Sequence, residues 1–373
     1  MLHTDIPTEA TLRYLATVRE PFSVSIYLPT SPVPSHTETA RIELRNQLDE
    51  AAAQLADAGA SRAQIEELED AIVDLSADSQ FWQYLSHSLV IFVTAGHVQT
   101  FRVPSVLPPA LEVSDRLYIK PLVRAVTFPQ AAFVLALSEN AARLVEVSAG
   151  EGAYTVDVAD LPKDAASSVG LASISGRSPS GRIQGSEGRK VRLGQYSRSV
   201  DAAIRPILNG STVPLILATT EPLDGIYRGI TNYPHLAAET IRGNPDELSD
   251  ESLAASARPI LDALYASALD LLKEEVSSRF AQGTAVKDLS DIARAATYGA
   301  VDTLLFDMDT LIPGVVDENS GAITFSEADD AHSYGVVDEV VRRALLTGAR
   351  VLAVRAEDVP GGGPAAATVR FSV

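Results

Sequence analysis

The side chains best suited to chemistry in this sequence are cations gathered on one short segment. Glycine and serine are abundant around them, so the backbone can expose N–H groups while guanidinium groups bind phosphate oxygens through paired hydrogen bonds. The pattern suits phosphate contacts, but the residues alone favour the alternative, because runs of charge are usually solvated. The alternative is a solvated surface loop whose cations pair with the protein's own acidic faces. Residues 176–198 (GRSPSGRIQGSEGRKVRLGQYSR) contain Arg177, Arg182, Arg189, Lys190, Arg192 and Arg198 against the single acid Glu187.

A second pattern imitates a phosphoryl-transfer site. FDMDTL (306–311) follows a predicted strand and matches the DxDxT motif of phosphatases that use an aspartate nucleophile, and Asp329 and Asp330 would supply a later acidic pair for Mg²⁺. Such a site also needs a cation to balance the phosphoryl group, but no lysine follows Lys287. The 64 residues after Asp309 are too few for the remaining strands of such a domain. We therefore interpret the motif as the acidic end of a sheet strand.

The sequence lacks the residues that other common catalytic, metal and phosphate-binding sites require. The chain has no cysteine, which excludes disulfides, thiolate nucleophiles and cysteine zinc sites. Its 6 histidines form no HExxH pattern, and GSEGRKV (185–191) lacks the spacing and the hydroxyl of a P-loop. We predict no metal and no cofactor, and the residues alone reveal no catalytic set.

The hydrophobic patterns that must position these residues predict an α/β protein of three domains. We place an N-terminal α/β domain at 1–122, a middle domain at 123–283 and a C-terminal α/β/α sandwich at 284–373. The middle domain opens with three β-rich runs (131–138, 142–148 and 153–158), which predict a mixed sheet with a meander at one side. A long loop is predicted at 162–193, and a long helix at 249–280.

The charge of the whole chain argues against general binding to polyanions. The 373 residues carry a net charge of −19, but residues 176–198 are +5 and the rest are −24. Anionic partners must therefore be bound locally, and we expect neither DNA nor a membrane as a partner. The start resembles no secretory signal and no apolar run is long enough to span a membrane, so we expect a cytoplasmic protein.

Several stretches, taken in order, resemble a known family. The resemblance is to the bacterial relatives of archaeo-eukaryotic peptide-chain release factor 1, and it runs from about residue 22 to the C-terminus. The stretches that carry it include SVSIYLPTSPVPSHTETARIELRNQLDEA, FWQYLSHSLVIFVTAGHVQTFRVP, GQYSRSVDAAI, PLILATTEPLDGIYRGITNYPHL and VPGGGPAAATVRF.

The resemblance implies an RNase-H-like middle domain with a long loop, and a C-terminal domain similar to the kink-turn-binding ribosomal-protein fold. In classical release factors this loop presents a Gly-Gly-Gln tripeptide to the peptidyl-transferase centre, where it helps water hydrolyse the peptidyl-tRNA ester. This chain contains no Gly-Gly-Gln. Gln195 is expected on the helix after the loop, and Gln184, in GRIQG, is the one weak catalytic candidate.

Our first hypothesis is a ribosome-associated factor that acts in rescue or hibernation. Its six loop cations would contact tRNA or ribosomal RNA near the peptidyl-transferase centre, and a translational GTPase is a further expected partner. No stop-codon-reading motif is recognisable, so codon-specific termination is not expected. One alternative is a non-ribosomal protein–protein interaction module, in which an acidic scaffold recognises a basic partner. A weaker alternative is a peptidyl-tRNA ester hydrolase that uses Gln184.

Overall fold

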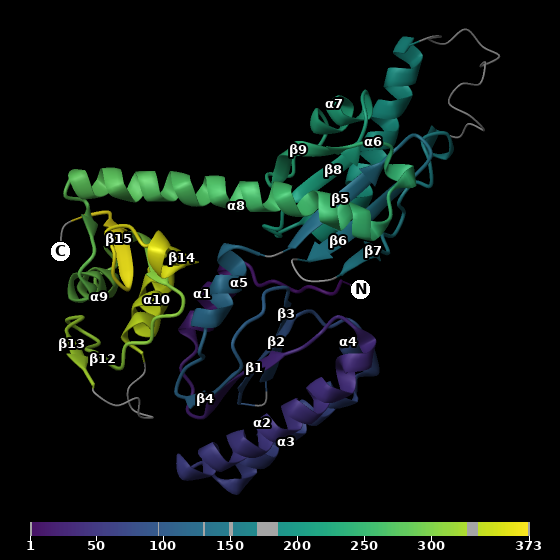
Figure 1. Cartoon of the computed structure of the whole chain (residues 1–373). Coiled ribbons are helices and arrows are strands. Elements are labelled where there is room, and N and C mark those ends of the chain that lie inside the picture. The colour runs from purple at the N-terminus through teal and green to yellow at the C-terminus, as the bar shows by residue number, and fades with distance from the viewer. Residues whose placement is uncertain are drawn as a thin grey trace. The chain divides into compact units, whose positions relative to one another are not determined.

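The computed structural model describes residues 2–95, 97–129, 131–148, 152–169, 186–326 and 335–371 (Figure 1). The chain divides into two compact units, which are described separately. The middle unit comprises Gln130–Tyr265 together with Met1–Leu2. The terminal unit comprises His3–Pro129 and Ala266–Val373. The predicted α/β fold class is confirmed, since helices and sheets alternate in both units.

The middle unit is built on a five-stranded mixed sheet. Its strand order is β7-β6-β5-β8-β9, where β6 is antiparallel to both of its neighbours and β8 is parallel to both of its own. This confirms the predicted meander at one side. The strands are β5 (Ala131–Leu137), β6 (Ala142–Ser148), β7 (Ala153–Val156), β8 (Leu215–Thr219) and β9 (Leu236–Arg242).

Helices cover this sheet because each presents an apolar face to it. On α8 (Asp250–Ala281), Leu253, Ala257 and Leu261 pack against Ile216 and Ala218 of β8. The prediction of a long helix at 249–280 is confirmed, to within one residue at each end. The other described helical elements of this unit are the long helix α6 (Ser186–Leu208) and three short ones. The short ones are η2 (Ser167–Val169), α7 (Leu223–Arg228) and η3 (Pro245–Glu247).

The N-terminal segment of the terminal unit folds around an antiparallel sheet of order β3-β2-β1-β4. Alternate residues of a strand point to opposite faces. Val24 and Ile26 therefore pack with α2 and α3, whereas Tyr27 faces the opposite side. The elements are α1 (Glu9–Thr17), β1 (Ser23–Pro29), η1 (Pro34–His36), α2 (Thr37–Asp57), α3 (Arg62–Ala77), α4 (Ser79–Gln83), β2 (Ser88–Thr94), β3 (His97–Val103), β4 (Ala110–Ser114) and α5 (Lys120–Thr127).

The C-terminal segment forms a second sheet, of order β10-β15-β11-β14, with helices on both faces. Leu272 and Val276 of α8 pack against Leu305 on one face, and α9 and α10 cover the other. The α/β/α layering is as predicted. The elements are β10 (Ala285–Val286), α9 (Leu289–Thr297), β11 (Val301–Asp307), β12 (Gly314–Val316), β13 (Ile323–Phe325), α10 (Val336–Leu346), β14 (Arg350–Val354), η4 (Ala356–Asp358) and β15 (Ala365–Val369).

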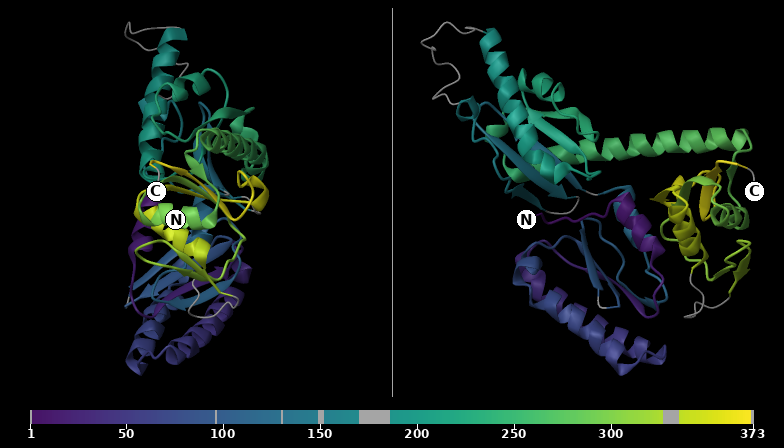
Figure 2. Two further views of the ribbon diagram at one scale, coloured as in Figure 1. Left: turned by 90° about the vertical axis from the view of Figure 1, so that its left-hand side faces the viewer. Right: turned by 180° about the vertical axis from the view of Figure 1, so that it is seen from behind.

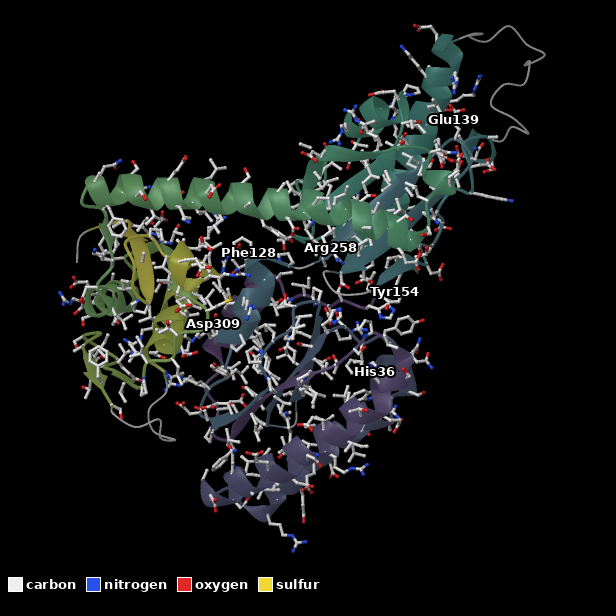
Figure 3. All side chains as sticks on the ribbon, viewed as in Figure 1. His36, Phe128, Glu139, Tyr154, Arg258 and Asp309 are labelled. Carbon is white, nitrogen blue, oxygen red and sulfur yellow. The ribbon has the colours of Figure 1, made fainter. Side chains whose placement is uncertain are left out.

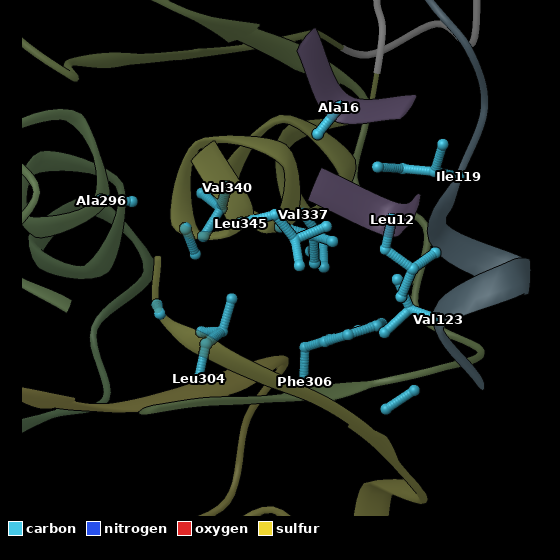
Figure 4. Close-up of a cluster of buried hydrophobic side chains, with 14 of the residues drawn as sticks. Leu12, Ala16, Ile119, Val123, Ala296, Leu304, Phe306, Val337, Val340 and Leu345 are labelled. Atoms are coloured by element: carbon cyan, nitrogen blue, oxygen red, sulfur yellow. The ribbon is translucent and has the colours of Figure 1, made fainter. Parts of the chain in front are cut away.

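A single hydrophobic core joins the two segments of the terminal unit. Leu12 of α1 and Val123 of α5 lie against Phe306 of β11 and Val337 of α10 (Figure 4). Each of these four side chains is at most 2% exposed. Separating the N-terminal from the C-terminal segment would expose this apolar surface, so the two segments stabilise each other.

Candidate nucleic-acid interface

Helix α6 carries most of the predicted phosphate-binding cations. Its buried face is an apolar stripe at helical spacing, formed by Leu193, Tyr196, Val200 and Ile204. The prediction of a loop over 162–193 is wrong for residues 186–193, because α6 begins at Ser186. Glycine and serine dominate only before this point, and the following Glu, Arg, Lys, Val and Leu residues include strong helix formers. The expected helical position of Gln195 is confirmed.

Lys190 and Arg198 are the cations of α6 best placed to meet a ligand. Both are exposed and lie two turns apart on one side of the helix. Neither forms an ion pair with a residue that the structure describes. The N-terminal end of α6 extends beyond the strands of the middle unit's sheet (Figures 1 and 2). The two cations therefore lie where a large polyanion can reach them.

Other cations of α6 are partly compensated by acids. Arg189 forms an ion pair with Glu139, which lies beside the helix (Figure 3). Arg205 pairs with Asp201 at 2.7 Å, and Asp201 also accepts a 3.3 Å hydrogen bond from the hydroxyl of Tyr227 on α7. Burial, together with the charge of Asp201, raises the pKa of Tyr227, so this hydroxyl stays a neutral donor. These contacts fix the C-terminal half of α6 against α7.

Gly194 lies between Lys190 and Arg198, one helical turn from each. A Cβ built at this position would meet only the Nη1 atom of Arg198, at 3.9 Å. Glycine in a helix interior costs about 1 kcal/mol relative to alanine, and no crowding inside the protein requires it here. A glycine between two exposed cations allows a backbone or a phosphate to approach the helix closely.

Sequence reasoning missed two features of this surface. Arg205 was not among the candidate residues because the basic segment, drawn by composition, ended at residue 198, and Gly194 was not singled out although it lies inside that segment. Had the helix been predicted from residue 186, spacings of seven and eight residues would have placed Lys190, Arg198 and Arg205 on one side. Three predicted site residues, Arg177, Arg182 and Gln184, lie outside the described residues.

The DxDxT pattern forms a closed turn after β11. The Asp307 carboxylate accepts a 3.1 Å hydrogen bond from the backbone N–H of Asp309 and another from the hydroxyl of Thr310. Lys120 donates to the Thr310 carbonyl at 2.5 Å, and Asp309 lies 3.9 Å from Arg124. Asp307 therefore caps the turn, as its interpretation as the acidic end of a strand requires. Asp329 and Asp330 are outside the described residues.

A polar cavity of about 630 Å³ lies at the carboxyl ends of β8 and β9. Its Asp224 is held by Arg228 at 2.9 Å and by Thr240 at 3.0 Å. The Asp224 carboxylate therefore has a structural role, because it holds Arg228 and Thr240 together. Within the described ranges, no group of three His, Asp or Glu side chains is arranged to hold a metal ion. No described helix is both long and apolar enough to cross a membrane.

Comparisons with solved structures give distant likenesses. An archaeal translation termination factor, aRF1, is 17% identical, with 98% of this chain and 99% of that chain covered and a TM-score of 0.26. Dom34 of S. cerevisiae, described as a translation termination-like factor interacting with Hbs1, is 11% identical over 77% and 74%, with a TM-score of 0.43. Archaeal Pelota, in a ribosome-bound model with ABCE1, is 15% identical over 99% and 96%, with a TM-score of 0.40. Scores this low establish no functional relationship.

Comparison with family models gives a more specific result. No curated protein matches the chain. The model of bacterial archaeo-eukaryotic release factor family 11 matches residues 129–267, which include the whole middle sheet and α6. Residues 129–267 thus resemble bacterial archaeo-eukaryotic release factor family 11, and the predicted resemblance to bacterial release-factor relatives is confirmed over that part of the chain.

Proposed function

We propose that this protein is a ribosome-associated, release-factor-like factor that contacts RNA through α6 and the segment before it. One coincidence carries the proposal: the segment that matches a release-factor family also holds the one strongly basic stretch of a chain whose net charge is −19. On that stretch, Lys190 and Arg198 are exposed and flank a glycine. Exposed cations beside an open helix surface are suited to phosphate contacts.

The contact is made by several cations together. Lys190, Arg192 and Arg198 would bind phosphates from α6, and Arg189 would do so by exchanging Glu139 for an RNA phosphate. Arg177 and Arg182, in the preceding segment, would add two more contacts. Acidic surfaces elsewhere repel RNA, so the protein would bind in one orientation. Its RNA target would be tRNA or ribosomal RNA near the peptidyl-transferase centre, in the cytoplasm.

The role that we propose is ribosome rescue or hibernation, with a translational GTPase as a further partner. Codon-specific termination is not part of the proposal, since the sequence shows no stop-codon-reading motif. Peptide release would require Gln184 to position a water against the ester carbonyl of peptidyl-tRNA. Without the preceding Gly-Gly pair, we expect the protein to bind without hydrolysis. Release from a peptidyl-tRNA analogue on stalled ribosomes, abolished by Gln184→Ala, would contradict that expectation.

The test is co-sedimentation with ribosomes from growing and starved cells. We expect the wild-type protein to sediment with ribosomes and the double variant Lys190→Ser/Arg198→Ser to stay largely in the supernatant. The matched control is Arg62→Ser/Arg350→Ser, which removes two exposed cations outside the middle unit and changes the net charge equally. Equal sedimentation of the two double variants would show that α6 is not the contact.

A further inference from the structure

A cavity of about 320 Å³ opens in the terminal unit where the α2–α3 hairpin meets one end of the N-terminal sheet. It lies at the lower end of the range of small-ligand sites, about 300–1,000 Å³. Neither the family match nor the proposed RNA contact involves it. Its lining residues are Glu20, Pro21, Phe22, Leu55, Gln64, Glu67, Leu68, Val93 and Ala95.

The lining is apolar with an acidic edge. Leu55, Leu68 and Val93 belong to the core between the sheet and the hairpin, and Phe22 packs against the same core. Glu20 and Glu67 supply two carboxylates, and none of the lining residues is basic. An apolar stem that ends in a positive charge matches both features. Lysine and arginine side chains have this form.

Glu20 is held firmly in position although its carboxylate is incompletely satisfied. Its backbone N–H donates to the Asp115 carbonyl at 3.0 Å, and its own carbonyl accepts from the Ser23 hydroxyl at 2.8 Å. The side-chain Oε2 atom is buried and has no hydrogen-bond partner. An unsatisfied buried oxygen is costly. A cation bound beside Glu20 would reduce that cost.

Two lining residues adopt an unusual backbone conformation. Phe22 has φ of 64° and Ala95 has φ of 27°, and only one other described non-glycine residue, Asp160, has positive φ. For a bulky residue such as phenylalanine this conformation is a true outlier. Retained strain of this kind is concentrated at binding sites. Here both strained residues line the same cavity.

We propose that this cavity is a docking site for an arginine or lysine side chain of a basic partner protein. The apolar lining would cover the stem of the side chain, and Glu20 and Glu67 would pair with its charged end. Residues 1–122 carry 8 basic and 16 acidic residues, so the surrounding field also attracts a basic protein. Through this site the protein would bind a basic partner protein whether or not α6 binds RNA.

The test is amide chemical-shift mapping of the full-length, deuterated protein. The probes are n-butylguanidinium and an end-blocked Gly-Ser-Arg-Ser-Gly peptide. Pentanoate is the control of opposite charge, and an end-blocked Gly-Ser-Gly-Ser-Gly peptide is the control without a charged side chain. We expect both arginine-like probes to shift the amides of residues 20, 22, 64–68 and 93–95, and neither control to do so. Shifts with pentanoate equal to those with butylguanidinium would overturn the proposal.

Paired variants give the test its specificity. Glu20→Gln/Glu67→Gln should weaken the binding of both arginine-like probes at least fivefold. Glu66→Gln/Glu69→Gln makes the same charge change on α3 outside the cavity and should leave affinity unchanged. Equal losses in the two double variants, or binding of butylguanidinium without the peptide, would contradict a partner's side chain as the occupant. Unshifted amides elsewhere establish that each variant is folded.

Discussion

The guanidinium of Arg116 donates a 2.7 Å hydrogen bond to the carboxylate of Glu339, a residue 223 positions away in the chain. Glu339 also accepts from Arg342 and Arg343 at 2.7–2.8 Å, and its side chain is only 4% exposed. One carboxylate thus connects the N-terminal segment to α10 within the terminal unit. Burial opposes its ionisation, but the hydrogen bonds and charges of these arginines outweigh burial and lower the pKa of Glu339 to about 2.

Removing the charge of Glu339 should destabilise the terminal unit strongly. Glu339→Gln keeps the shape of the side chain but removes the counter-charge that Arg342 and Arg343 share, while Arg116 keeps its contact with Asp115. We expect a loss of about 3–5 kcal/mol in the free energy of unfolding, measured by urea denaturation. Glu318→Gln, at an exposed carboxylate 3.7 Å from Arg19, is the control and should change stability by less than about 1 kcal/mol. Similar losses in both variants would refute the role of Glu339.

Asp338 should make the free energy of unfolding depend on pH, in the sense opposite to that expected for Glu339. Burial raises its pKa from 3.8 to about 6, although the charge of Lys120 opposes the shift, and neither side-chain oxygen has a hydrogen-bond partner. The folded state therefore favours the protonated acid. That contribution is complete below about pH 4 and is lost as pH rises through about 6.

The variant Asp338→Asn should remove this dependence. Its stability relative to wild type should improve between about pH 4 and pH 7 by on the order of 3 kcal/mol. Urea denaturation at both pH values measures the difference, which isolates the charge from any packing effect of the amide. A variant that tracks wild type across this range would show that Asp338 remains ionised. Glu339 affects stability in a different pH range, since its contribution to the free energy of unfolding is lost only as pH falls from 4.5 towards 2.

Gly194→Ala should change stability and binding in opposite directions. The added methyl group meets only the flexible end of Arg198, so the helix should gain up to about 1 kcal/mol. The same methyl group would occupy the space between Lys190 and Arg198, and we expect weaker association with ribosomes. Thermal denaturation and co-sedimentation measure the two effects, with Ala202→Gly at another exposed position of α6 as the helix-propensity control. Unchanged association would remove Gly194 from the proposed contact.

Local patterns of the sequence predicted much of the fold. The runs at 131–138, 142–148 and 153–158 became the meander β5-β6-β7, because period and β-branched content specify a strand directly. The long α8 was predicted from apolar residues that recur at helical spacing. The short helices α1 and α5 were not predicted, since their stability depends on burying Leu12 and Val123 in a core completed by residues near 300–340.

The candidate site was predicted only in outline. The sequence located the cations, but composition could not show that Arg189 and Lys190 lie on a helix, or that Glu139 and Asp201 pair with Arg189 and Arg205. Such pairing depends on tertiary contacts between distant residues. The positive φ of Phe22 was likewise beyond prediction, since residue type favours glycine at such a position.

The most direct measurement of the central claim is the salt dependence of binding to ribosomes. If about five of the six cations engage single-stranded RNA, the logarithm of the association constant should fall against the logarithm of salt concentration with a slope of roughly −3.5. The Lys190→Ser/Arg198→Ser variant removes two contacts and should reduce that slope to about −2. Association that is independent of salt, or a slope unchanged in the variant, would contradict the account.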